Sequence, residues 1–142
     1  MKITTTIARY LLGFIFTVFG LNGFLHFLPM GSPPPLAGQF FGAMVQSHFM
    51  VPVFALQLIC GLLLLVNRYV PLALTILGAV LFNILLFHIF MAPSGLPLAL
   101  FVTLLWAVVA WRARAVFAPL LQDSYEAPAP RKEGGREMRS VA

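Results

Sequence analysis

Charge is scarce in this sequence, and the apolar part of the chain holds almost none of it. Only 9% of the 142 residues are charged, whereas soluble domains average about 25%. Between Arg9 and Arg112 the single charged residue is Arg68, and all four acidic residues follow residue 121. With 61% apolar residues and a mean hydropathy of +0.95, this distribution predicts an integral membrane protein.

Cysteine is nearly absent as well, and its scarcity excludes one class of membrane redox enzyme. The only cysteine is Cys60, which lies within an apolar run. Enzymes that pass electrons between dithiols and quinone need two cysteines that form and resolve a disulfide. A lone cysteine cannot do this within one chain, so Cys60 is interpreted as a small apolar core residue.

Carboxylates are missing from the apolar part of the chain, so it offers neither a carboxylate proton relay nor a hard-metal site. The sequence also contains no C-x-x-C-H motif and no glycine-rich phosphate loop. No metal site is therefore predicted. A nucleic-acid partner is not predicted either, because the basic residues lie beside apolar runs or in a tail that also carries acids.

Four apolar runs are present, and each approaches or exceeds the roughly 20 residues that cross a ~30 Å hydrocarbon core. They cover residues 10–28, 49–66, 69–92 and 96–111. Asn67-Arg68, followed by Pro71, predicts a tight turn between the second and third runs. We therefore expect an all-α bundle of four transmembrane helices over residues 1–121. The tail over 122–142 is rich in proline, glycine and charge, which predicts disorder.

Basic residues predict the orientation of this bundle. In a four-span arrangement every Lys and Arg falls on one side, and the loops at 29–48 and 92–95 on the other side carry none. The positive-inside rule then places both termini in the cytoplasm. Within the outer loop, apolar residues at helical spacing predict a short amphipathic helix. These residues are Ala37, Phe40, Phe41, Met44 and Val45.

The two halves of the apolar region resemble each other, which predicts two helical hairpins related as parallel repeats. Chance similarity between leucine-rich segments is the alternative explanation. The matching positions are Arg9, Asn22, His26 and Pro29 in the first half and Arg68, Asn83, His88 and Pro93 in the second.

Five polar side chains fall in the outer half of the predicted spans, and they are the candidate ligand-binding residues: Asn22, His26, Gln57, Asn83 and His88. A rise of 1.5 Å per residue places them roughly 5–15 Å from the outer helix ends. Asn22 and His26 are four residues apart, so we expect them to share a helix face. Asn83 and His88 are five apart and diverge unless a one-residue π-bulge realigns them.

This predicted polar layer has several interpretations. The side chains can act as hydrogen-bond clamps between helices. They can instead line a small pocket that opens to the outer side and binds the polar head of a quinone, with Phe24, Phe27, Phe87 and Phe90 around it. A third interpretation, axial ligation of haem by two histidines, is less favoured because it rests on the two imidazoles alone.

Three stretches make the chain resemble the DoxX-like family of small bacterial integral membrane proteins. They are FGLNGFLHF at 19–27, GLLLLVNRYVPLAL at 61–74, and FNILLFHIFM at 82–91 with the Pro-Ser-Gly that follows. The resemblance covers about residues 7–121. Relatives named for this family include a quinone-reducing thiosulfate oxidoreductase subunit, and others resemble accessory membrane partners of redox enzymes.

The resemblance implies a multi-pass protein of the bacterial cytoplasmic membrane. It further implies an accessory or quinone-contacting component of a redox assembly, so any enzymatic activity would be that of a quinone-linked oxidoreductase. The family offers no established catalytic motif to carry over, and catalytic residues stay unassigned. The alternatives are a non-catalytic membrane scaffold or partner protein and, less favoured, a b-type cytochrome or a small transporter that forms a homo-oligomer in the lipid bilayer.

Overall fold

A computed structural model describes residues 2–29 and 31–121, and every regular element in these two ranges is helical. The all-α prediction is confirmed, whereas the tail over 122–142 lies outside the described residues. The elements are α1 (Lys2–Leu25), α2 (Pro35–Gln46), α3 (Met50–Leu65), α4 (Val70–Phe90), the 3-10 turn η1 (Pro93–Gly95), α5 (Leu96–Arg112), α6 (Arg114–Phe117) and η2 (Ala118–Leu121).

Three segments are long and apolar enough to cross a membrane: Ile3–Leu25, Val70–Phe90 and Pro93–Arg112. Helix α3 has 16 residues and rises only about 24 Å. It forms a fourth candidate span together with α2, which meets it at an angle of 87°. Three or four such helices indicate a multi-pass membrane protein.

The helix boundaries agree with the predicted runs except in α1. This helix begins at Lys2 and ends at Leu25, so the predicted span of 10–28 starts too late and ends too late. The early end has a local cause, because His26 takes a φ of +51°. A residue in this left-handed conformation cannot continue an α-helix. The other three helices match their runs within two residues at each end.

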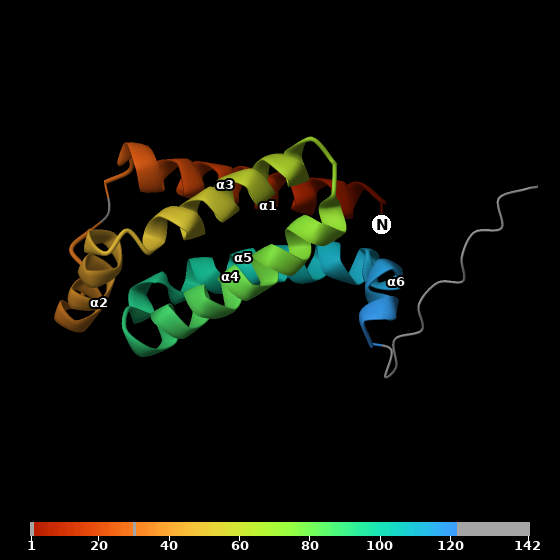
Figure 1. Cartoon of the computed structure of the whole chain (residues 1–142). Coiled ribbons are helices and arrows are strands. Elements are labelled where there is room, and N and C mark those ends of the chain that lie inside the picture. Colours follow the sequence, from red (N-terminus) through yellow and green to blue (C-terminus); the bar gives the residue numbers. More distant parts are fainter. Residues whose placement is uncertain (1, 30, 122–142) are drawn as a thin grey trace, which may run out of the picture.

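The helices pair as two hairpins that close into a ring (Figure 1). Helix α1 packs against α3 and α5, and α4 packs against the same two helices. The core at the centre is apolar, with Leu12, Leu64 and Leu77 fully buried. The start of α1, the α3–α4 turn and the end of α5 meet at one end of the bundle, which we call the basic end. The opposite end carries α2 and the α4–α5 connection.

The amphipathic helix predicted in the long loop is present as α2, and it lies across the opposite end of the bundle (Figure 1). Pro35 occupies its first turn, where the missing N–H costs no hydrogen bond. Ala37 is fully buried, and the Phe40 ring packs against Phe87 of α4 with centroids 6.2 Å apart. Ala37 and Phe40 therefore contact the bundle, whereas Phe41 and Val45 of the same helix are exposed.

The closest packing in the bundle joins α1 and α3 through glycine. A methyl group added to Gly61 would lie 2.6 Å from the backbone nitrogen of Thr17, and one added to Gly20 would lie 2.6 Å from that of Leu58. No side chain fits between backbones at such distances. Helix association in lipid depends on van der Waals packing rather than on the hydrophobic effect, and small residues permit it. The glycines therefore set the separation of α1 and α3.

Substitution of Gly61 by alanine tests this contact. We expect Gly61→Ala to lower the free energy of unfolding by about 1–3 kcal/mol, because overpacking forces the two backbones apart. Unfolding in detergent micelles, followed by circular dichroism, measures the change. Gly42→Ala in α2 is the matched control, since nothing lies within 4 Å of an added methyl there. Equal shifts in the two variants would contradict a backbone contact at Gly61.

Candidate functional site

Asn22 is buried near the end of α1, with 8% of its surface exposed. Its side-chain Oδ1 accepts a hydrogen bond from the backbone N–H of Leu28 at 2.7 Å. Its backbone carbonyl accepts a second one from the N–H of His26 at 2.9 Å. Both bonds close the turn that follows the helix, so Asn22 caps the end of α1.

His26 lies beyond the end of α1, and its side chain is exposed. The expectation that Asn22 and His26 share a helix face is wrong, because the helix ends between them at Leu25. The third histidine, His48, takes a similar left-handed conformation, with a φ of +61°, between α2 and α3. Both histidines therefore lie at turns of the backbone, in a conformation that few residues other than glycine adopt.

Asn83 and His88 both lie within α4, which is a continuous α-helix from Val70 to Phe90. The π-bulge predicted between them is absent from this described helix, so their side chains diverge around it. Asn83 is exposed, and its Nδ2 donates to the Ala79 carbonyl one turn earlier at 2.9 Å. This bond satisfies part of the amide within its own helix.

His88 is half-buried and joins the end of α4 to the turn that follows. Its Nδ1 lies 2.9 Å from the carbonyl oxygen of Ala92, at hydrogen-bond distance. The ring meets Phe87 edge-on with centroids 5.3 Å apart. It also fills the space beside Gly95, where an added methyl group would overlap the imidazole. His88 therefore fastens α4 to η1.

Gln57 differs from the other four candidates, because it is buried and has no hydrogen bond within the described part of the chain. Only 7% of its surface is exposed, and it shares the inward face of α3 with Cys60 and Leu64. No described side-chain polar atom is both fully enclosed and unbonded. The Gln57 amide must therefore border open space.

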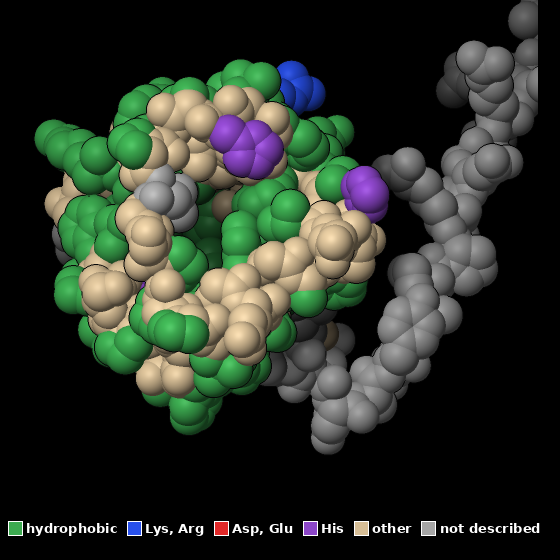
Figure 2. Space-filling view, turned by 90° about the vertical axis from the view of Figure 1, so that its left-hand side faces the viewer, with side chains coloured by type: hydrophobic (Ala, Val, Ile, Leu, Met, Phe, Trp, Pro, Cys, Tyr) green, Lys and Arg blue, Asp and Glu red, His purple; other side chains and the backbone are tan. Residues whose placement is uncertain are grey.

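Gln57 lies near the middle of α3, between the two ends of the bundle. The end face that carries α2 is hollowed near its centre, as the space-filling view shows (Figure 2). Helix α3 begins at this end, and Gln57 lies seven residues after Met50, or about 10 Å along the helix. An amide thus lies on the inward side of α3, about 10 Å along the helix from the end that carries α2.

The five predicted residues therefore do not form one continuous polar layer. The structure buries Asn22 and Gln57, leaves His26 and Asn83 exposed, and half-buries His88. Three of the five side chains bond to nearby backbone at a helix end or within their own helix. Within the described residues, no three His, Cys, Asp or Glu side chains gather as they would around a metal ion.

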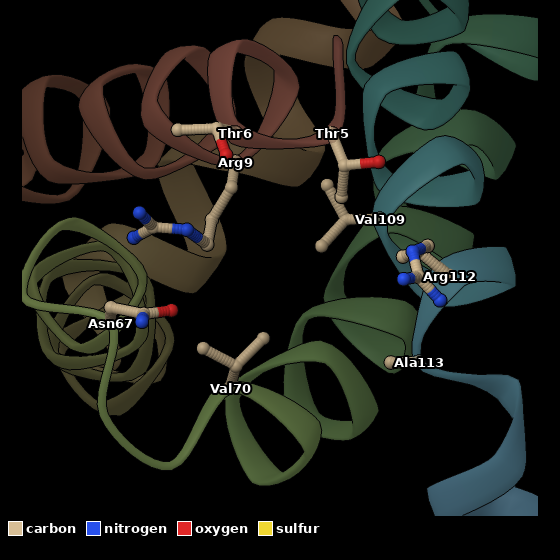
Figure 3. Close-up of a pocket in the computed structure, with 8 residues that line it drawn as sticks. All are labelled: Thr5, Thr6, Arg9, Asn67, Val70, Val109, Arg112 and Ala113. Carbon is tan, nitrogen blue, oxygen red and sulfur yellow. The ribbon is translucent and has the colours of Figure 1, made fainter. Parts of the chain in front are cut away.

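A second site, which the sequence reasoning missed, lies at the basic end. It is a cavity of about 350 Å³ between α1, the α3–α4 turn and α5, and we call it the basic-end cavity (Figure 3). Its lining residues are Thr5, Thr6, Arg9, Asn67, Val70, Val109, Arg112 and Ala113. Thr5, Thr6 and Arg9 lie close together in the sequence, and this cluster of polar residues could have indicated a site. The sequence did not show that they lie near Asn67 and Arg112 in space.

Arg9 closes one wall of this cavity by capping α3. The guanidinium donates to the backbone carbonyls of Leu64 and Leu65, and it lies 4.3 Å from the centroid of the Tyr10 ring. Cations are favourable at a helix C-terminus, where unsatisfied carbonyls carry partial negative charge. Arg9 is therefore 9% exposed although it is charged.

The two asparagines of the predicted repeat allow a matched test of their roles. We expect Asn22→Ala to lower the free energy of unfolding by about 1–3 kcal/mol, because the partly buried Leu28 N–H loses its acceptor. Asn83→Ala should change it by less than about 0.5 kcal/mol, since that side chain is exposed. Thermal unfolding of both variants in one detergent measures the difference. Equal destabilisation would contradict the capping role of Asn22.

Comparisons of the chain with protein-family models, with curated proteins and with solved structures found no match. The assignment of a function therefore rests on the geometry and on the sequence.

Proposed function

We propose that this chain is a four-span membrane protein that binds a small apolar molecule with a hydrogen-bonding head, of the quinone class, inside its helix bundle. In this proposal it is a DoxX-like accessory component of a redox assembly in the bacterial cytoplasmic membrane. The observation that carries the binding proposal is Gln57, a buried amide without a hydrogen bond to the described residues.

The Gln57 amide is largely buried but borders accessible space, so a ligand there can supply its missing hydrogen bond. Transfer of such a group out of water without a hydrogen-bond partner costs roughly 2–7 kcal/mol, depending on the reference state. A bound molecule that accepts a hydrogen bond from the side-chain Nε2 of Gln57 removes that cost. Quinone carbonyls are acceptors of this kind, and the rest of a quinone is apolar enough to reach the site through the membrane.

The surroundings of Gln57 suit such a molecule. The amide shares its helix face with Cys60 and Leu64, which are fully buried and apolar. At the hollow end of the bundle, aromatic rings pack against one another, with Phe87 between Phe40 and His88. In this proposal a flat apolar head group lies against these residues, and the Gln57 amide fixes its orientation.

A non-catalytic scaffold is the second candidate, and a specific observation favours it. Asn22, Asn83 and His88 all have their bonds inside the chain, so they leave few groups for a ligand. A scaffold would use the bundle only to present its lipid-facing surface to other membrane proteins. The two candidates differ in whether Gln57 has an external partner.

Substitution of Gln57 by leucine distinguishes them. Leucine has a similar volume but no donor, so quinone occupancy should fall about tenfold for the loss of roughly 1.4 kcal/mol of hydrogen bonding. Extraction of quinone from protein purified in mild detergent, followed by mass spectrometry, measures occupancy. Titration with a short-chain quinone, followed by tryptophan fluorescence, measures affinity directly.

Asn83→Leu is the control, because Asn83 is exposed on the outside of α4. It should leave quinone occupancy unchanged. Wild-type occupancy in the Gln57→Leu variant would refute the assignment of Gln57. A wild-type protein that binds no quinone in either measurement would favour the scaffold.

Fusion reporters test the proposed topology. A fluorescent protein fused after residue 142 should fluoresce, and alkaline phosphatase at the same position should be inactive, because the basic residues favour a cytoplasmic C-terminus. Phosphatase inserted in the loop between α1 and α2 should be active. The reverse pattern would contradict the orientation, and phosphatase activity at both positions would contradict an even number of spans.

A further inference from the structure

Within residues 2–29 and 31–121, the positive charge of the basic-end cavity has no carboxylate to balance it. It is lined by two guanidinium groups, whereas all four acidic residues of the chain follow residue 121. The partners of Arg9 are backbone carbonyls and the Tyr10 ring, which orient the cation but do not neutralise it. Residues 2–29 and 31–121 therefore contain no carboxylate that could balance the two cations.

Arg112 is the more available of these two cations. It lies at the end of α5 and is exposed, and it makes no hydrogen bond or ion pair with the described residues. Arg112 lies on the α5 side of the cavity, whereas Arg9 descends from α1 and turns its guanidinium toward the side of Asn67 (Figure 3). The cavity thus has one arginine on its α5 side and another on its α1 side.

The remaining walls suit an anion with an apolar attachment. Helix α4 begins at Val70, on the cavity wall, and no side chain caps its first turn. Pro71 in this turn has no N–H, but the other N–H groups of the uncapped turn and the helix dipole favour negative charge. Val70 and Val109 supply apolar surface beside these polar groups. This combination resembles the junction between a lipid headgroup and its acyl chains.

We propose that the basic-end cavity binds a phosphate group between Arg9 and Arg112, supplied by the headgroup of an anionic phospholipid. Arginine pairs with phosphate through two parallel charge-assisted hydrogen bonds. Basic pockets between transmembrane helices are established sites for anionic headgroups. The cavity volume of about 350 Å³ falls within the ~300–1,000 Å³ typical of ligand sites. The site is independent of the quinone proposal, because it lies at the other end of the bundle.

Lipid binding by Arg112→Gln tests the site. The full-length protein in mild detergent is titrated with phosphatidylglycerol and, separately, with a neutral glycolipid that has no phosphate, and native mass spectrometry counts bound lipid. We expect the phosphatidylglycerol affinity to fall about tenfold in the variant, for the loss of a charge-assisted pair. Glycolipid binding should not change.

Arg114→Gln is the matched control at the same end of the bundle. Arg114 carries the same charge, but it does not line the cavity, and its guanidinium lies 3.0 Å from the Trp111 carbonyl oxygen and 5.2 Å from the Trp111 ring centroid. We expect phosphatidylglycerol affinity within about twofold of wild type, because an exposed charge contributes little. An equal loss in the two arginine variants would overturn the proposal in favour of general surface attraction. Wild-type affinity in Arg112→Gln would overturn it as well.

Ala113→Leu provides a second variant that keeps every charge. The larger side chain fills part of the cavity, so phosphatidylglycerol binding should fall although both arginines remain. Circular dichroism shows whether each variant keeps its helices. Unchanged binding in a folded Ala113→Leu protein would overturn the placement of the phosphate in this cavity.

Inorganic phosphate identifies the source of the group. If the site takes lipid, millimolar inorganic phosphate should not displace phosphatidylglycerol. If inorganic phosphate binds with the same dependence on Arg112, the phosphate site stands and its natural ligand is a soluble anion. Both results support the site and distinguish its two sources.

Discussion

Contact between the backbones of α1 and α3 is the constraint on which the rest of the structure depends. Glycine at 13, 20 and 61 removes side chains from the crossing, so main-chain atoms of one helix lie against the other. Apolar side chains gain little by leaving lipid, so close packing must hold such helices together. The contact also sets an antiparallel register, in which each step along α1 corresponds to a step back along α3.

That register explains how the basic end is built. Gly13 lies against Gly61, so Arg9, one turn before Gly13, reaches the carbonyls of Leu64 and Leu65, about one turn after Gly61. Arg9 thereby satisfies helix-end carbonyls in a place where water is scarce. No carboxylate among the described residues balances the charge of Arg9, so the electrostatic potential in the adjacent cavity is positive. A packing contact in the middle of the bundle thus leads to a binding site at its end.

Polar residues in the membrane region follow two different rules. Asn22 and His88 bond to the backbone at helix ends, and Asn83 bonds to its own helix, so each serves local structure. Gln57 lies in mid-helix on an inward face, and no described backbone group bonds to it. The sequence placed all five residues at similar depth, but depth does not reveal partners. A polar residue becomes a candidate for ligand binding when the structure shows that its side chain has no hydrogen-bond partner within the protein.

The amino-acid sequence by itself determined the class of this protein, because long uncharged apolar runs are stable as helices in lipid. It also located the turn at Asn67 and the helix within residues 29–48, where local spacing decides the structure. The sequence pattern did not reveal the end of α1 although its cause is local, because the left-handed residue there is His26 and not glycine. Only the tertiary structure decided how the basic end is assembled. It alone brought Thr5, Asn67 and Arg112 to one cavity, because residues so far apart in the chain meet only when the helices pack.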